Sequence, residues 1–309
     1  MADSFERARY AASLVKVTYD AKPALTVFAD AKPKAVVPKT VLGEEPEIKI
    51  GDAEKAMAAA AVKVDHTYTT PRHYHNALEP HATLAAWDGD RLTVYDSTQY
   101  LHGVRQMLAE KFGVPEGNVR VIGPTVGGGF GGKGLAWPHV ALAAAAAKAV
   151  GRPVKFALPR EAMYGMTGYR TPTEQRVALA ADKEGKLTAL IQTGITATST
   201  TNVFTEQFTF AARHLYASPN IHLLQKLVTL DAGPPTFMRA PGEMPGMFAL
   251  ESALDELSYA LKLDPVELRV RNDPDKDPTK GTPFSLRKYK ESLRLGAEKF
   301  GWAKRKPEP

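Results

Sequence analysis

A run of glycines is the feature of this sequence that most restricts its fold. Five of the six residues 127–132 are glycine, and the remaining one is Phe130. The run follows residues 119–122, which have the composition of a strand, and precedes residues 140–150, an alanine-dominated segment typical of a buried helix. Glycines between a strand and a helix let backbone amides approach a ligand closely, and such amides suit anions or oxo groups. Because glycines flank it, we expect the Phe130 side chain either to be displayed on the surface of the loop or to be wedged against neighbouring residues.

Two nucleotide-binding motifs fit the spacing of this run but lack their partner residues. Gly127, Gly129 and Gly132 match the dinucleotide pattern, yet residues 117–160 contain no Asp or Glu to bind a ribose. The same run also matches a phosphate loop, but Gly134 stands where Ser or Thr would hold magnesium. Both a Rossmann site and an NTPase are disfavoured. Two interpretations of the glycine run remain: it is a turn that binds no ligand, or it binds a different cofactor.

The rest of the chain predicts an α+β fold with mixed sheets, in which hairpins alternate with single packed helices. Turn residues separate paired apolar runs, and apolar residues recur at helical spacing between the hairpins. The expected helices cover residues 6–9, 53–62 after the cap Asp52, 101–112, 140–150 and 248–261. The expected strands cover residues 14–19, 83–87, 92–96, 119–122, 176–181 and 187–192, and residues 31–48 are expected to form a surface connector.

The composition excludes several classes of chemistry. None of the 309 residues is cysteine, so thiolate zinc sites, thiolate-held iron–sulfur clusters, disulfides and thiol nucleophiles are absent. The net charge of +6 comes from interspersed charges, and no nucleic-acid partner is expected. No apolar run reaches the roughly 18 residues of a membrane helix, and residues 1–20 lack a secretory signal. We therefore expect no membrane insertion and a cytoplasmic location, or a periplasmic one if a signal-bearing partner exports the chain.

His75, Glu79 and His81 lie within seven residues, which leaves a zinc site open as an alternative. Pro80 argues against the helix that would bring them onto one face. The lysines Lys63 and Lys133 have no evident partner in the sequence and are expected to be solvated.

Four ordered segments resemble the xanthine dehydrogenase and aldehyde oxidase family of molybdenum hydroxylases. They are residues 75–81 (His-Asn-Ala-Leu-Glu-Pro-His), residues 96–99 (Asp-Ser-Thr-Gln), the glycine loop 126–133, and residues 238–242 (Met-Arg-Ala-Pro-Gly) with the following segment 251–271. Residues 239–242 (Arg-Ala-Pro-Gly), together with residues 132–139 (Gly-Lys-Gly-Leu-Ala-Trp-Pro-His) after the loop, most resemble the molybdenum subunit of bacterial periplasmic-type aldehyde oxidoreductases. The resemblance implies that residues 1–34 are the remnant of a small N-terminal α/β domain, residues 35–52 a connector and residues 53–309 the first molybdopterin-binding domain.

The resemblance also implies a set of site residues. Gln99 and Arg239 take the catalytic positions, with Gln99 donating a hydrogen bond to the apical oxygen of the metal. No protein side chain ligates molybdenum, because the dithiolene of the pterin does so. The cofactor-binding residues are Gln99, Gly128, Gly129, Phe130, Gly131, Gly132, Arg239, Ala240 and Gly242, and the substrate pocket takes Phe130, Leu135 and Pro241. The expected cofactor is molybdenum-molybdopterin in its cytosine dinucleotide form.

Departures from the family pattern refine this prediction. Purine-oxidising members carry Glu at the position of Gly134 and an aromatic residue at that of Pro241, so an aldehyde substrate is favoured over a purine or another N-heterocycle. The glutamate base of the family has no counterpart here, which makes the chain alone inactive. We expect three partner chains: an iron–sulfur subunit with 2Fe–2S clusters, an FAD subunit, and a chain that supplies the second molybdopterin-binding half. A cofactor-free truncated remnant or scaffold is the alternative.

Overall fold

The computed structural model describes residues 1–306, which form two compact units. The first unit comprises Met1–Thr26, Tyr74–Tyr169 and Asp231–Thr236, and the second comprises Val27–His73, Arg170–Leu230 and the residues from Phe237 onward. Each unit has its own sheet and its own core, so the α+β class with mixed sheets is confirmed. The two units are described separately below.

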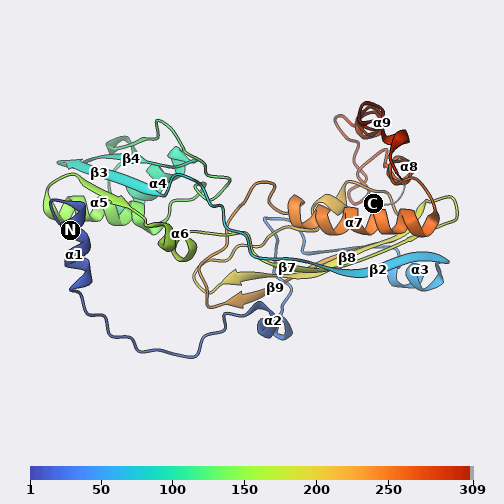
Figure 1. Cartoon of the computed structure of the whole chain (residues 1–309), viewed down its shortest axis with the longest axis horizontal. Coiled ribbons are helices and arrows are strands. Elements are labelled where there is room, and N and C mark those ends of the chain that lie inside the picture. Colours follow the sequence, from blue (N-terminus) through green and yellow to red (C-terminus); the bar gives the residue numbers. More distant parts are fainter. Residues whose placement is uncertain (307–309) are drawn as a thin grey trace. The chain divides into compact units, whose positions relative to one another are not determined.

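The first unit is a four-stranded mixed sheet with helices packed on one face. Its strands run in the order β5 (Val119–Ile122), β4 (Arg91–Asp96), β3 (Ala82–Asp88) and β6 (Val154–Ala157), and only the β4–β5 pair is parallel. Helices α4 (Leu101–Phe112) and α5 (Pro138–Val150) cover the face that carries Leu92 and Val94 (Figure 1). Helices α1 (Phe5–Ser13) and α6 (Arg160–Met166) complete the unit, with a 3-10 turn at Glu116–Asn118.

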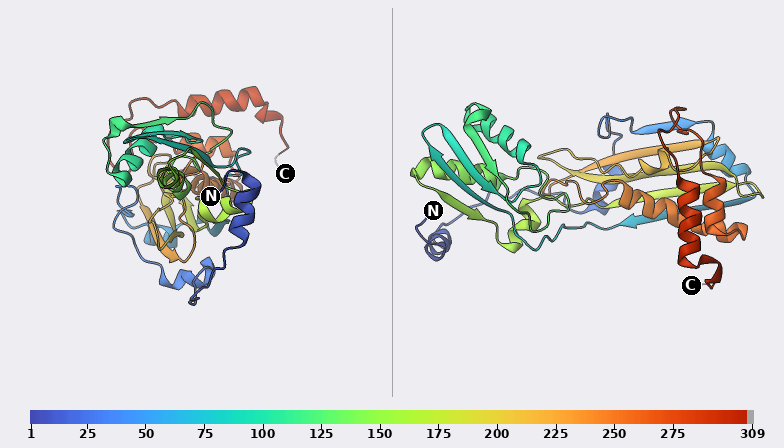
Figure 2. Two further views of the ribbon diagram at one scale, coloured as in Figure 1. Left: turned by 90° about the vertical axis from the view of Figure 1, so that its left-hand side faces the viewer. Right: turned by 90° about the horizontal axis from the view of Figure 1, so that it is seen from above.

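The second unit contains a five-stranded mixed sheet covered on both faces. The strand order is β1 (Glu47–Ile50), β9 (Ile221–Leu230), β8 (Leu187–Ser199), β7 (Thr173–Ala181) and β2 (Val62–Thr70), and the β8–β9 pair is parallel (Figures 1 and 2). Side chains of β7 alternate between two cores, as a strand requires. Val177 and Leu179 pack towards α7 (Glu243–Leu261), whereas Ala178 and Ala180 pack towards α3 (Ala53–Ala59).

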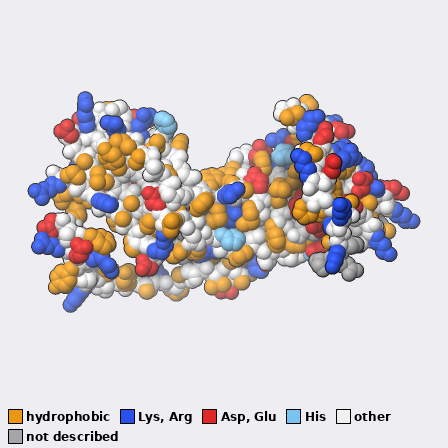
Figure 3. All heavy atoms as spheres, turned by 45° about the horizontal axis from the view of Figure 1, so that its top comes forward, with side chains coloured by type: hydrophobic (Ala, Val, Ile, Leu, Met, Phe, Trp, Pro, Cys, Tyr) orange, Lys and Arg blue, Asp and Glu red, His pale blue; other side chains and the backbone are white. Residues whose placement is uncertain are grey.

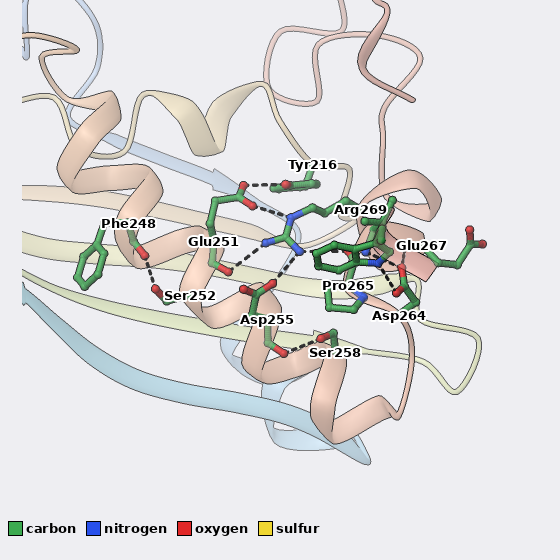
Figure 4. Close-up of polar contacts among 12 residues, drawn as sticks. Tyr216, Phe248, Glu251, Ser252, Asp255, Ser258, Asp264, Pro265, Glu267 and Arg269 are labelled. Atoms are coloured by element: carbon green, nitrogen blue, oxygen red, sulfur yellow. Dashed lines mark hydrogen bonds and ion pairs between the residues drawn. The ribbon is translucent and has the colours of Figure 1, made fainter. Parts of the chain in front are cut away.

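An ion-pair network fastens α8 (Pro265–Arg271) to α7. Figure 4 shows the Arg269 guanidinium between Glu251 and Asp255, at 2.7 Å and 2.9 Å from their carboxylate oxygens. The buried Tyr216 hydroxyl donates to the other oxygen of Glu251 at 2.7 Å. Asp264 caps α8 by accepting from the amides of the helix's first turn. The remaining helices are α2 (Phe28–Ala31) and α9 (Tyr289–Phe300), with 3-10 turns at Lys32–Lys34, Ala211–Arg213 and Trp302–Lys304.

Two expectations for the N-terminal part were wrong, and one expected helix ends earlier than predicted. Residues 14–19 alternate like a strand, but they follow α1 as an exposed segment that pairs with no strand of the described chain. Alternation predicts a strand only where a neighbouring edge accepts its hydrogen bonds. The expected connector 31–48 begins with the last residue of α2 and the 3-10 turn Lys32–Lys34, and its last residues belong to β1, which pairs with β9. The expected helix 53–62 ends at Ala59, and Val62 already belongs to β2.

No helix within residues 1–306 combines the length and apolar character needed to span a bilayer. On the face drawn in Figure 3, Lys and Arg side chains are interspersed with Asp and Glu side chains. The interspersion agrees with the charge pattern of the sequence, in which the excess of six positive charges is distributed over the chain.

Two glycines of the second unit predict opposite responses to alanine. A Cβ at Gly246 in α7 would overlap the backbone carbonyl of Phe208, whereas one at Gly296 in α9 meets no atom within 4 Å. Alanine is about 1 kcal/mol more favourable than glycine inside a helix. We expect Gly296→Ala to raise the free energy of unfolding by up to about 1 kcal/mol. Gly246→Ala should lower it by about 2 kcal/mol through overpacking. Urea denaturation measures both, and equal responses would contradict the packing at Gly246.

Candidate functional site

Three segments of the first unit meet at one edge of its sheet. Because β4 and β5 are parallel, the residues that follow them emerge at the same edge, and these are Ser97–Gln99 and the glycine loop. Strand β3 is antiparallel to β4 and begins opposite its end, where Thr83 pairs with Asp96. The segment before β3, which contains Glu79, therefore reaches this edge as well. The strand topology of the first unit thus gathers three of the sequence-predicted segments.

The side chain of Gln99 is clamped by the backbone of the glycine loop. Its Oε1 accepts from the amides of Gly131 and Lys133 at 3.0 Å and 3.3 Å, and the backbone amide of Gln99 donates to the Lys133 carbonyl at 2.8 Å. Two N–H donors converge on one atom of the side-chain amide, so that atom is the oxygen. The NH₂ group has no partner within residues 1–306. Gln99 is thus a fixed donor with two unused hydrogens.

Lys133 anchors the end of the glycine loop from inside the unit. Its side chain is 1% exposed, and Nζ donates to Glu79 Oε2 at 2.7 Å, the Glu79 carbonyl at 3.0 Å and Ser97 Oγ at 2.7 Å. Glu79 Oε2 also accepts from Ser97 Oγ at 2.5 Å and from the Gly127 amide at 2.7 Å. The expectation that Lys133 is solvated was therefore wrong, because a charge cluster invisible in the local sequence surrounds it.

This cluster sets the protonation of Glu79. Burial alone would raise the pKa of its carboxyl, but hydrogen bonds from Lys133, Ser97 and the Gly127 amide outweigh burial and lower the pKa to about 2. The carboxylate is charged at all physiological pH values. It holds the first amide of the loop while its charge balances the buried ammonium of Lys133.

The glycine loop leaves room for backbone approach and displays its aromatic residue. Gly131 has φ +98°, which favours glycine, and a Cβ at Gly129 would lie within 3 Å of the Gln99 side chain. A Cβ at Gly132 would lie 2.6 Å from the His75 ring. Phe130, itself at φ +53°, is 50% exposed. Its prediction as a displayed residue agrees with this position.

The second group of predicted residues belongs to the second unit. Arg239 and Ala240 are exposed in the segment that precedes α7, with Ala240 at φ +55° and Gly242 at φ +81°. The Arg239 side chain has no hydrogen-bond or ion-pair partner among residues 1–306. The backbone of this segment is held by Arg170, Glu206 and Gln207, none of which the sequence singled out.

The predicted site residues divide between the two units. Gln99 and the loop residues Gly128–Gly132 come together with Leu135 following them in the first unit, whereas Arg239, Ala240, Pro241 and Gly242 lie in the second. Their roles stay predictions. The alternative zinc site finds no support, since within the described chain no three His, Asp or Glu side chains gather around a possible metal position. Glu79 is instead engaged by Lys133.

Two histidines are buried behind the glycine loop. His81 Nε2 lies 3.3 Å from the Gly132 carbonyl, its ring packs edge to face on that of His139, and both residues are at most 4% exposed. Burial lowers the pKa of His81 to about 4, with the Lys133 charge adding to the shift. The pKa of His139 is likewise about 4, chiefly through burial and further through the charges of His81 and Lys133. Both rings are neutral at pH 7.

Comparison with known proteins finds one family and several long relatives. The family described as "Molybdopterin cofactor-binding domain" matches residues 33–273. The aldehyde oxidoreductase molybdenum-binding subunit PaoC of Escherichia coli K12 is 43% identical over the whole chain, which covers 42% of that relative. The putative xanthine dehydrogenase molybdenum-binding subunit XdhA of the same strain is 30% identical over 97% of the chain, again covering 42% of the relative.

Among solved structures, an aldehyde oxidoreductase from Desulfovibrio gigas superimposes with a TM-score of 0.83 at 27% identity. The match covers 98% of this chain and 34% of the other. The chain therefore spans about two fifths of the length of the curated relatives named above, and about one third of this solved chain.

The two buried histidines predict acid sensitivity. Their pKa of about 4 lies below the value of 6.5 expected after unfolding, so the unfolded chain takes up more protons between these values. The free energy of unfolding should consequently fall as the pH drops from about 6.5 towards 4. In His139→Gln, the loss between pH 6.5 and pH 5 should be smaller by about 1.5 kcal/mol. Urea denaturation at each pH measures it, with the exposed His102 as His102→Gln for control. Equal losses in wild type and His139→Gln would refute the prediction.

Proposed function

The chain belongs to the molybdopterin cofactor-binding domain family, and from this membership we propose that it is the cofactor-binding part of a molybdenum hydroxylase that oxidises aldehydes to carboxylic acids, with water as the oxygen source. The observation that carries the proposal is the clamped Gln99. Its amide oxygen is tied to two loop amides, so that its NH₂ group is aimed away from the loop backbone and remains unused.

The residues of the first unit fit the cofactor in three respects. The pterin of this cofactor ligates the metal. No cysteine of the protein is needed for this, which agrees with a chain that contains none. Positions 129 and 132 admit no Cβ without a clash, so the loop backbone stays bare for close approach. Gln99 supplies a neutral donor that changes no charge at the metal. When bound, molybdenum-molybdopterin supplies the two-electron oxidation, and we propose its cytosine dinucleotide form by analogy with bacterial aldehyde oxidoreductases.

The chain's own residues would then bind and orient the reactants. The NH₂ group of Gln99 would hold the cofactor by a hydrogen bond, and the backbone around Gly129 and Gly131 would line it. Arg239 offers a planar guanidinium with no competing partner, which suits anionic or oxygen groups in a fixed geometry. Phe130, Leu135 and Pro241 are proposed to line the substrate pocket.

Completion of the enzyme requires other chains or segments. The chain spans 42% of the length of its curated relatives, and we propose that a second molybdopterin-binding half supplies the glutamate base. Electrons that leave molybdenum need further carriers, and a chain without cysteine cannot ligate the usual iron–sulfur clusters. We therefore assign 2Fe–2S clusters and FAD to partner subunits.

The glycine loop provides the first test. Gly129→Val places a branched side chain against Gln99, and Gly131→Val forces valine to φ +98°. We expect both variants to lose at least about 90% of the bound molybdopterin while the second unit stays folded, because the loop backbone can no longer approach the pterin. Metal analysis together with pterin fluorescence measures retention.

A matched control is Gly117→Ala, since a Cβ at Gly117 meets no atom within 4 Å. It should retain molybdenum like the wild type. Normal occupancy in both valine variants would mean that the loop is only a turn, and would support the alternative of a cofactor-free scaffold.

Substrate choice provides the second test. Gly134 offers no carboxylate for the polar edge of a purine, and Pro241 offers no aromatic face for stacking. Each buried polar atom of a purine left without a partner costs about 1 to 3 kcal/mol. In the completed complex we expect benzaldehyde-like substrates to have a kcat/KM at least roughly a hundredfold above that of hypoxanthine or xanthine. If steady-state assays gave either purine the higher kcat/KM, the proposal of an aldehyde substrate would be wrong, and the alternative of a purine or N-heterocycle substrate would be supported.

A further inference from the structure

A buried ion pair underlies the segment that carries Arg239. Arg170 and Glu206 are 2% and 0% exposed, and Arg170 Nε lies 3.5 Å from Glu206 Oε1. Burial lowers the pKa of Arg170 and raises that of Glu206, while their mutual attraction opposes both shifts. Burying such a pair is costly, and apolar residues of the same volume commonly serve stability as well or better. Its role must be sought in what the pair contacts.

The pair grips residues 238–242 through their backbone. Arg170 Nη2 donates to three successive carbonyls, those of Met238, Arg239 and Ala240, at 2.8, 2.5 and 3.1 Å. Glu206 Oε1 accepts from the Gly242 amide at 2.6 Å. The remaining carbonyl of the segment, that of Pro241, accepts from Gln207 Nε2 at 3.3 Å. Every carbonyl from 238 to 241 therefore faces a donor from the body of the unit.

The opposite edge of this segment is left for a ligand. The amides of Met238, Arg239 and Ala240 donate to no acceptor among residues 1–306, and the Arg239 side chain is exposed. A backbone whose carbonyls point inward presents N–H groups outward, which attracts anionic or oxygen-rich groups. Ala240 adopts a strained positive φ in this arrangement, and Gly242 adopts a positive φ that glycine tolerates without strain.

We infer that Arg170 and Glu206 are positioning residues, which turn the carbonyls of residues 238–242 inward and so direct the amides and Arg239 towards the cofactor. The inference rests on the proposed function for the identity of the ligand. The geometry of the segment is independent of it.

The test replaces the pair by apolar residues of similar volume, as Arg170→Met with Glu206→Leu. If the pair only stabilised the fold, this double variant would resemble the wild type. If it positions the segment, the double variant folds but its 238–242 segment is released. Trypsin reports this release directly, because cleavage after Arg239 requires its carbonyl to leave Arg170. We expect cleavage between Arg239 and Ala240 to accelerate at least about tenfold in the cofactor-free chain.

Molybdenum and pterin content after expression with the cofactor supply gives the second readout. We expect at least roughly a fivefold loss in the double variant. Arg170→Lys keeps the charge but replaces Nε and Nη2 by a single nitrogen, which cannot stay beside Glu206 and bind the three carbonyls at once, so cleavage should still accelerate. The matched control is Arg269→Met with Glu251→Leu, the α7–α8 pair of Figure 4, which removes an ion pair of the same unit without contacting residues 238–242. It should leave cleavage after Arg239 within about twofold of wild type.

Wild-type cleavage in the Arg170→Met and Glu206→Leu double variant would overturn the inference. So would faster cleavage with an unchanged cofactor content, because the segment would then not need the pair to hold the pterin. A wild-type chain that takes up no molybdopterin under any condition would refute the proposed function instead, and the trypsin result would still decide whether the pair positions the segment.

Discussion

The arrangement of the first unit depends on one buried charge. An ammonium as secluded as that of Lys133 is tolerated only where every proton finds an acceptor. Glu79 and Ser97 provide those acceptors at the sheet edge. With Nζ fixed there, the backbone of Lys133 has little freedom, and that backbone is what grips Gln99. The position of the Gln99 side chain thus follows from the ion pair between Lys133 and Glu79.

In the second unit, too, a buried ion pair holds the backbone of a loop. There the buried Arg170 donates to carbonyls of the segment 238–242, and Glu206 accepts from the amide of Gly242. Loops that bind oxo or phosphate groups need outward N–H groups, which isolated turns do not maintain. In both units the carboxylate of a charged pair accepts a hydrogen bond from a backbone amide of the loop, and in both the loop contains residues with positive φ.

The sequence predicted the elements and motifs whose determining residues lie close together in the chain. The hairpin β3–β4, helix α4 and the helical spacing in α7 followed from turn residues and apolar periodicity. The glycine loop and Gln99 were found because the motif is contiguous. Lys133 was misjudged because its partners precede it by 54 and 36 residues. Arg170 gave no signal at all, since its carbonyl acceptors lie about seventy residues away and only the fold brings them together. Residues 14–19 had the alternation of a strand but found no edge to pair with.

The electrostatics of the glycine-loop edge also limit what this chain contributes to catalysis. A general base must be accessible and must accept a proton near neutral pH. Glu79 fails the second condition, because its partners hold the pKa of its carboxyl at about 2. Asp96 fails the first: burial raises the pKa of its carboxyl, but the side chain is enclosed and accepts a 2.5 Å hydrogen bond from Thr83. His81 and His139 are equally enclosed. None of these four side chains therefore meets both conditions, and the exposed NH₂ group of Gln99 is a donor.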